Sequence, residues 1–265
     1  MNREALLALL NAGWLGRRLE CHAELSSTND RARALLDERG TDAHGAVVFA
    51  DWQSAGRGRQ GRTWFSPSGL GLAASIALKP PSYPPNISCL PLAGSLAVAA
   101  LLKETAGFAA SLKWPNDVLV DGRKIAGILL EGRYLSDKPS GLVLGIGLNL
   151  YHGPSDFPPE LRENATSLAA SGGPALPPEV YAAGLLRALE PLLDLGLVRP
   201  EALVERAEPL WVHARGDFLD VAWTDGTLSG RFLGVEPDGS LALDCEGTRR
   251  AVRFGDVVKV RRAGL

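Results

Sequence analysis

Three arginines and three glycines share the stretch from Gly56 to Trp64, which reads Gly-Arg-Gly-Arg-Gln-Gly-Arg-Thr-Trp. Glycine lets the main chain form tight turns and approach a ligand closely. Arg57, Arg59 and Arg62 bring planar, permanently charged guanidinium groups to the same loop. A loop of this kind suits an anion with several oxygens, such as a phosphate or a carboxylate. A flexible, solvated basic loop is the alternative interpretation.

The same loop matches the Gly-x-Gly-x-x-Gly pattern of dinucleotide-binding proteins at Gly56, Gly58 and Gly61. That pattern requires a strand before the loop and a helix that opens at it. Val47–Phe49 is a candidate strand, but a proline and a glycine between residues 63 and 69 prevent the helix. The context therefore argues against a dehydrogenase-type nucleotide site.

A second group of polar residues surrounds a proline, in Lys113-Trp114-Pro115-Asn116-Asp117. Pro115 prevents a helix and biases Trp114 toward an extended conformation. We therefore expect Lys113, Asn116 and Asp117 at the end of a strand, where a ligand can reach them.

The residues that follow predict a hairpin with a two-residue turn at Asp121-Gly122. Its returning strand carries Lys124 within an otherwise apolar run. A solvated sheet edge that carries both Lys113 and Lys124 is the alternative interpretation of this segment.

A run of small polar residues, Ser26-Ser27-Thr28-Asn29, precedes a helical pattern over residues 31–39. Ser27 or Asn29 would serve as an N-cap, which explains the run structurally. The functional interpretation is that these hydroxyl and amide groups orient a polar group of a ligand.

The rest of the chain divides into a larger and a smaller unit. From residue 218, short strands punctuated by turns predict a small antiparallel barrel or sandwich. Upstream of it, we expect strands over residues 45–50, 70–78 and 141–150 and helices over residues 92–105, 178–194 and 200–213.

The composition limits the function classes. A net charge of −2 over 265 residues argues against a broad nucleic-acid-binding face. The three cysteines are scattered, which suggests reduced thiols in the cytoplasm rather than disulfides or a zinc site. The longest apolar run, over residues 90–102, is too short to span a bilayer.

The clustered cations have one nearby acid, Asp117, and no nucleophile with a paired base. The four histidines lie in unrelated sequence contexts. Cations without a nucleophile suit a reaction in which charge accumulates on a phosphate. Activation of a carboxylate by ATP, with release of pyrophosphate, is such a reaction.

Taken together, the motifs resemble the biotin protein ligase family in order and spacing from about residue 20 to 150. The matching segments are Ser27-Thr28-Asn29, Gln53, Gly56–Trp64, Lys113–Asp117, Lys124–Leu129 and Gly145–Asn149. The resemblance implies an α+β fold: a mixed-sheet catalytic domain with helices, akin to class II aminoacyl-tRNA synthetases, over residues 1–215. It also implies a small SH3-like β-barrel domain over residues 216–265.

The family's activity implies that biotin and ATP form biotinyl-5′-AMP with Mg²⁺, and that biotin then passes to a lysine of a biotin carboxyl carrier protein. By resemblance, the catalytic residues are Lys124, Arg59 and Lys113. The implied biotin-binding residues are Ser27, Thr28, Asn29, Gln53, Arg57, Gly58, Arg59 and Lys124. The implied ATP-binding residues are Arg62, Trp64, Lys113, Asn116, Asp117 and Asn149, with Asp117 as the metal ligand.

One departure from the bifunctional family members concerns the N-terminus. Fewer residues precede Ser27 than a helix-turn-helix domain requires. We therefore expect a monofunctional cytoplasmic ligase that binds neither DNA nor membranes, as a monomer or a homodimer. A lipoate or octanoate ligase or transferase of the same superfamily is one alternative, and a non-catalytic anion or nucleic-acid binder is another.

Overall fold

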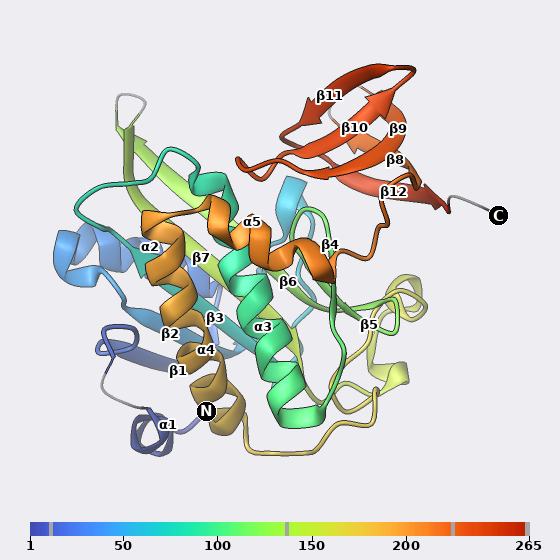
Figure 1. The fold of residues 1–265 in the computed structure, drawn as a ribbon. Helices are drawn as coiled ribbons and strands as arrows, with labels where there is room; N and C mark the ends of the chain where they lie inside the picture. The colour runs from blue at the N-terminus through green and yellow to red at the C-terminus, as the bar shows by residue number, and fades with distance from the viewer. Residues whose placement is uncertain (11–12, 136–137, 224–225, 263–265) are drawn as a thin grey trace.

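Two β-sheets make up the strand framework of the computed structural model, which describes residues 1–10, 13–135, 138–223 and 226–262 (Figure 1). The first has seven strands in the order β1-β2-β3-β7-β6-β5-β4. β1 and β2 are parallel and the other pairs are antiparallel, so the sheet is mixed as expected. Its strands are β1 Leu19–Leu25, β2 Val47–Gln53, β3 Gly71–Leu78, β4 Ser111–Lys113, β5 Asp117–Val120, β6 Arg123–Leu135 and β7 Lys138–Asn149.

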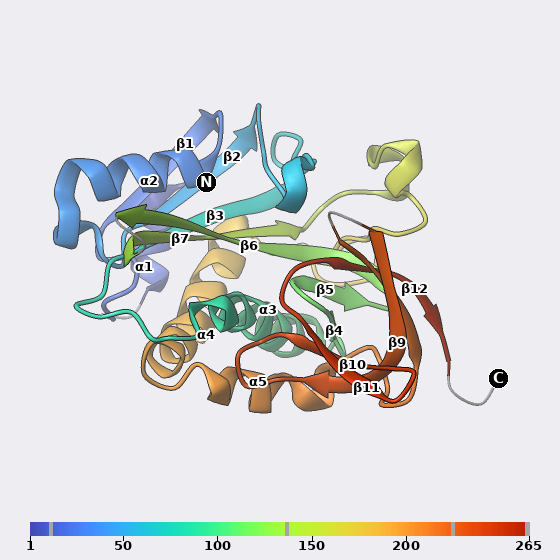
Figure 2. The same cartoon turned by 90° about the horizontal axis from the view of Figure 1, so that it is seen from above.

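Helices cover both faces of this sheet (Figure 2). α2 packs on one face, where Leu35 and Leu36 meet Val48 and Val143. α3 and α4 pack on the other face against the alternate strand residues. The helices are α1 Arg3–Leu9, α2 Thr28–Arg39, α3 Leu90–Ala106, α4 Pro178–Val198 and α5 Glu201–Ala207.

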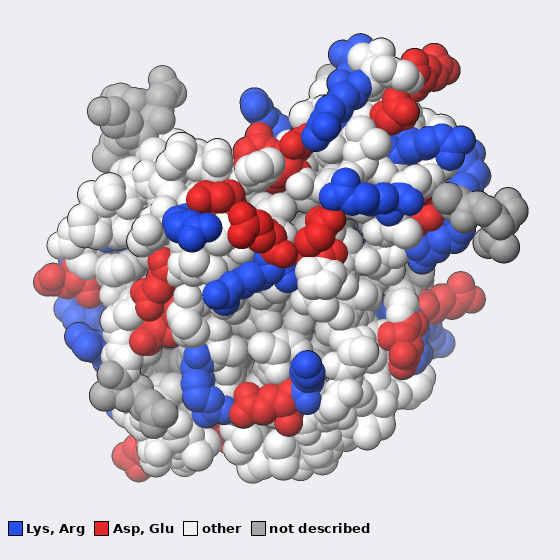
Figure 3. Space-filling view, in the orientation of Figure 1, with Lys and Arg blue, Asp and Glu red and all other residues white. Residues whose placement is uncertain are grey.

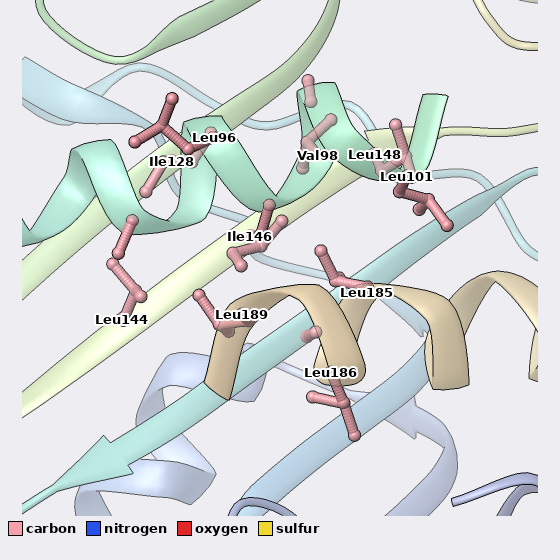
Figure 4. Close-up of a cluster of buried hydrophobic side chains, with 14 of the residues drawn as sticks. Leu96, Val98, Leu101, Ile128, Leu144, Ile146, Leu148, Leu185, Leu186 and Leu189 are labelled. Carbon is pink, nitrogen blue, oxygen red and sulfur yellow. The ribbon is translucent and has the colours of Figure 1, made fainter. Parts of the chain in front are cut away.

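The period-2 alternation of β7 decides which face receives which side chains. Leu144, Ile146 and Leu148 point into the apolar layer formed with α3 and α4 (Figure 4). Gly145 and Gly147 therefore face the α2 side, where they leave the surface of the sheet free of side chains. This bare strip is where the cavity described below lies.

The segment Ile87–Ala106, which contains α3, is long and apolar enough to cross a membrane by length and composition. Its most apolar window is 67% buried inside the fold. Together with its packing against α4 and the sheet, this burial identifies α3 as a core helix.

The second sheet is antiparallel, in the order β11-β10-β9-β8-β12. Among the described residues β11 and β12 do not pair, so the expected SH3-like unit is an open curved sheet and not a closed barrel. Its strands are β8 Phe218–Trp223, β9 Gly226–Val235, β10 Leu241–Cys245, β11 Thr248–Val252 and β12 Asp256–Arg261.

Trp114 of the first unit belongs to the apolar core of this second sheet, beside Leu219, Val221 and Phe232. The indole Nε1 of Trp114 also donates a hydrogen bond to the carbonyl of Gly239 at 3.0 Å. The Lys-Trp-Pro-Asn-Asp segment therefore joins the two sheets.

Several expected boundaries differ from the structure; for example, β2 covers Val47–Gln53 rather than residues 45–50. α2 begins at Thr28, three residues before the predicted start, because Gln53 accepts the hydrogen bond of the Thr28 N–H. α5 ends at Ala207 and a 3₁₀ turn continues to Leu210, so the helix predicted over residues 200–213 is shorter. The Asp121-Gly122 turn is confirmed, with both residues at positive φ.

Candidate active site

A cavity of about 290 Å³ lies over the bare strip of β6 and β7 on the α2 side of the sheet. It brings together most of the residues predicted from the sequence. Those that line it are Ser27, Thr28, Asn29, Gln53, Arg57, Gly58, Arg59, Arg62, Trp64, Asn116, Asp117, Lys124 and Asn149. Lys113 is not among the lining residues.

The neutral end of the cavity consists of Ser27, Thr28, Asn29 and Gln53. The backbone N–H of Thr28 donates to Gln53 Oε1 at 2.8 Å, which satisfies a donor at the start of α2. The Asn29 Nδ2 donates to Glu131 Oε2 at 2.6 Å. Ser27 occupies the N-cap position, but its side chain makes no capping hydrogen bond. The N-cap prediction therefore holds for position and not for the capping contact.

Gly145 makes room for this end of the cavity. A Cβ at Gly145 would lie 2.4 Å from Asn29 Oδ1, well inside van der Waals contact. The buried Asn29 amide therefore depends on a glycine in the neighbouring strand.

The indole of Trp64 forms the bottom of the cavity between its two ends. A Cβ at Gly147 would lie 2.3 Å from Trp64 Cε2, so the indole lies directly on the bare backbone of β7. The Lys124 Nζ lies 5.6 Å from the centroid of the same indole, within cation–π range. Trp64 therefore links the neutral end to Lys124.

The charged end consists of Asn116, Asp117, Lys124 and Asn149. Lys124 Nζ lies 2.6 Å from Asp117 Oδ1. The Asn116 Nδ2 donates to the carbonyl of Ile128, and the Ile128 N–H donates back to the Asn116 carbonyl at 3.0 Å. These contacts fix the Asn116–Asp117 corner against β6.

Lys113 lies opposite Asp117 in the register of the antiparallel strands β4 and β5. Its side chain is not among the residues that line the cavity. It is close enough to His213 to affect that group electrostatically. Burial lowers the pKa of His213 to about 4, and the charges of Lys113 and Arg262 add to the shift. The structure thus places Lys113 near the junction with the second sheet.

The arginine loop, residues 56–64, folds back on itself. The Gly58 N–H donates to the Arg62 carbonyl at 2.7 Å, and the Trp64 N–H donates to the Gly56 carbonyl at 2.9 Å. The turn between these pairs contains Gln60 and Gly61 at positive φ. The loop is therefore a short hairpin with a defined backbone.

Carboxylates of the protein hold all three arginines of this loop. Arg57 makes a bidentate pair with Asp30 at 2.7 and 2.8 Å. Arg59 and Arg62 both pair with Asp256 of the second sheet. A hydrogen bond from Arg57 lowers the pKa of Asp30, and burial lowers the pKa of Arg59.

The described residues contain no group of three or more His, Cys, Asp or Glu side chains that could hold a metal ion. Asp117 and Asp256 both line the cavity, and both are engaged by cations, Asp117 by Lys124 and Asp256 by Arg59 and Arg62. A divalent ion here would need most of its ligands from a substrate.

The sequence interpretation missed Ser75, Glu131, Asp30 and Asp256. Ser75 lies within the strand expected over residues 70–78, where its place between Ala73 and Ala77 marks a face with small side chains. Asp256 lies almost two hundred residues from the loop that it binds. No local pattern signals such a contact.

Comparison with known proteins shows which family has this sequence and fold. Residues 23–149 match the family model described as the biotin/lipoate A/B protein ligase family. The chain is 32% identical over 243 residues to the bifunctional ligase/repressor BirA of Bacillus subtilis, covering 92% of this chain and 74% of that protein. It is 34% identical over 260 residues to the biotin--[acetyl-CoA-carboxylase] ligase of Mycobacterium tuberculosis, covering 96% and 93%.

Among solved structures, the biotin protein ligase from Aquifex aeolicus in complex with biotin and ATP superposes with a TM-score of 0.77 at 28% identity. The match covers 93% of this chain and 100% of that one. Because relatives above 30% identity match over most of both chains, this chain belongs to the biotin/lipoate A/B protein ligase family, among its biotin protein ligases.

Proposed function

We propose that this protein is an ATP-dependent biotin protein ligase. In the first step a carboxylate oxygen of biotin attacks the α-phosphate of ATP, which forms biotinyl-5′-AMP and releases pyrophosphate. In the second step the amine of a carrier-protein lysine attacks the acyl carbon and AMP leaves. The observation that carries this proposal is a single cavity with neutral hydrogen-bonding groups at one end and Lys124 with Asp117 at the other.

The neutral end would bind the ureido head group of biotin. A ureido group has one carbonyl acceptor and two N–H donors, which hydroxyl and amide side chains complement. Both ends line the same cavity, so a bicyclic head group bound at the neutral end would direct its acid side chain along the cavity toward Lys124.

The charged end would hold the reacting groups. Lys124 would neutralise the carboxylate and then the acyl-phosphate oxygens, as a fixed cation does best in a site with little water. Asn116, Asp117, Asn149 and the loop residues Arg62 and Trp64 would contact ATP. For Lys113 the proposed contact with ATP requires a movement of the hairpin, since Lys113 does not line the cavity.

The arginine loop would cover the intermediate. Arg57, Gly58 and Arg59 lie along one wall, and a closed loop would keep water from the mixed anhydride. Because these arginines are paired with protein carboxylates, ligand binding would exchange those partners for ligand oxygens.

A Mg²⁺ ion fits this arrangement in a limited way. Mg²⁺ is usually held by one or two carboxylates together with substrate phosphates and waters. Asp117 would hold the ion after giving up Lys124, and Asp256 is a second carboxylate in the cavity lining. When bound, the ion would neutralise phosphate charge.

The acceptor would be a biotin carboxyl carrier protein, and the Mycobacterium tuberculosis relative is named for acetyl-CoA carboxylase. We propose residues 1–215 as the catalytic unit and 216–265 as the SH3-like unit. We also propose that the protein works in the cytoplasm and does not bind operator DNA. The net charge of −2 and the interspersed acidic and basic residues on the face in Figure 3 support that view.

The direct test incubates the protein with labelled biotin, ATP and Mg²⁺ and separates the products. We expect biotinyl-5′-AMP, and transfer of the label when a biotin carboxyl carrier domain is added. Lipoate in competition should not reduce the yield. Formation of a lipoyl adenylate in preference, or of no adenylate, would overturn the proposal.

A further inference from the structure

Ser75 is a fully buried hydroxyl in the middle of the strand β3, at 0% exposure. It does not line the cavity. Its Oγ lies 2.7 Å from Thr28 Oγ1 and 2.5 Å from Asn29 Oδ1. A buried hydroxyl is tolerated only where it is hydrogen-bonded, so these two contacts explain why a polar residue occupies this position.

The contacts determine where the protons lie. Glu131 is an acceptor, so the atom of Asn29 that faces it must be the amide nitrogen, and Oδ1 must face Ser75. The single hydroxyl proton of Ser75 then goes to Asn29 Oδ1. Ser75 Oγ also lies 2.7 Å from the Thr28 hydroxyl, whose proton has a second acceptor in Gln53 Oε1 at 3.0 Å, and Gln53 Oε1 accepts from the Thr28 N–H as well.

We propose that Ser75 is a positioning residue that, together with Glu131, holds the Asn29 amide in place, and thereby sets the preference for a ureido carbonyl in the head group. Ser75 does this without touching the ligand. The inference rests on the proposed function, because it assumes that the neutral end binds the ureido group.

The physical reason is the fixed polarity of the neutral end. With Ser75 present, the Asn29 amide is held at both of its polar atoms, by Glu131 at Nδ2 and by Ser75 at Oδ1. Without the Ser75 hydroxyl, Asn29 Oδ1 loses its buried donor and the amide is held by Glu131 alone. The amide is then positioned less precisely, and the match to a carbonyl flanked by two N–H groups is weakened.

The test measures the affinities for biotin and for 2-iminobiotin by calorimetry. 2-Iminobiotin has nearly the same shape but presents an N–H donor where biotin presents the ureido oxygen. For Ser75→Ala we expect biotin to bind about tenfold more weakly, the loss of one net hydrogen bond. The affinity for 2-iminobiotin should change little, so the ratio of the two affinities, which measures the preference for biotin, should fall about tenfold.

Ser95→Ala is the matched control. Ser95 is also a buried serine, at 1% exposure, and its hydroxyl donates to the Pro91 carbonyl within α3. This variant should keep the wild-type ratio of the two affinities. If Ser75→Ala does not fold, Ser75→Cys keeps the shape with a weak donor and should give an intermediate ratio.

An equal loss of affinity for both ligands, or an unchanged preference in folded Ser75→Ala or Ser75→Cys, would overturn the inference. The same change in Ser95→Ala would also overturn it, because the effect would then be one of general stability. Wild-type protein that does not bind biotin would instead refute the proposed function.

Discussion

The neutral end and the charged end of the cavity hold their functional groups in opposite ways. At the neutral end, hydrogen bonds rather than ion pairs hold Thr28, Asn29 and Gln53, with the Glu131 carboxylate accepting from Asn29, and Thr28 and Asn29 are at most 5% exposed. At the charged end and along the arginine loop, cations pair with partly exposed carboxylates, as Lys124 does with Asp117.

This difference indicates how each end would contribute to the reaction. The neutral end is organised before a ligand arrives, so binding there requires little rearrangement. The cations must instead give up Asp117, Asp30 and Asp256 before they can act on a ligand. These exchanges of partner would be favoured only when one ligand supplies several anionic oxygens at once. The arginine loop would therefore close when the intermediate is present.

The largest expected effect is on the adenylation activity of a Lys124 variant, which tests whether the charged end acts separately from the neutral end. Lys124→Ala should reduce biotin-dependent ATP–pyrophosphate exchange by about 10²–10³-fold, because it removes a donor that stabilises transition-state charge. Biotin affinity should fall far less, since the neutral end is intact. Exchange kinetics and calorimetry measure the two quantities.

Lys103→Ala, at an exposed site on α3, is the control and should retain wild-type exchange. Exchange near the wild-type rate in Lys124→Ala would remove Lys124 from the mechanism. An equal loss in both quantities would mean that the two ends are not separable.

A smaller effect is expected at the floor that joins the two ends. Gly147→Ala places a Cβ against the Trp64 indole and should displace it, lowering kcat/KM for adenylation by roughly tenfold through overpacking of about 1–3 kcal/mol. Gly141→Ala, in the same strand but outside the cavity, meets only the flexible end of Leu36. Similar losses in both variants would show that the effect comes from the strand and not from Trp64.

Most of the chemistry-bearing positions could be predicted from the sequence, because glycine, arginine and proline have strong local preferences. The hairpin at Asp121-Gly122 and the strand that carries Lys124 follow from such preferences. The ion pairs of the arginine loop could not be predicted. Asp256 meets Arg59 only because the second sheet folds back over the loop, and pairing at that separation depends on the tertiary structure.

Ser75 and Trp114 illustrate the remaining gap. The sequence around a single serine in a strand does not show whether the side chain faces the start of a helix or a packed apolar layer. That depends on the register of the strand in the sheet. The sequence motif around Trp114 predicts an extended residue beside the polar groups of a ligand site. In the structure its indole is part of the apolar core of the second sheet. In both cases burial by a distant element decides the role.

The arginine loop offers the next contrast. Arg59→Ala removes the guanidinium group that would pass from Gly255 and Asp256 to ligand oxygens, so the loop should close less firmly over biotinyl-adenylate and release it several-fold faster. A chase with unlabelled biotin measures the release. Arg250→Ala, at an exposed position of β11, should release at the wild-type rate. Unchanged retention in Arg59→Ala would show that the Arg59 guanidinium does not hold the loop closed over the intermediate.

The smallest effect concerns pH. The hydrogen bond from Arg57 lowers the pKa of Asp30, so the pair stabilises the fold above the unfolded carboxyl pKa of about 3.9 and is lost as the pH falls below it. Asp30→Asn should therefore reduce the free energy of unfolding by about 0.2–1 kcal/mol at pH 7, since the pair is partly exposed.

Urea unfolding at pH 7, 5 and 3.5 measures this difference, which should be constant between the first two values and smaller at the third. Ser95→Ala supplies the matched comparison, because the buried Ser95 hydroxyl donates to the backbone carbonyl of Pro91. Destabilisation by Ser95→Ala should therefore be the same at all three pH values. A pH-independent effect of Asp30→Asn would mean that Arg57 is not stabilised by charge, and the contrast between the two ends would then rest on Lys124 alone.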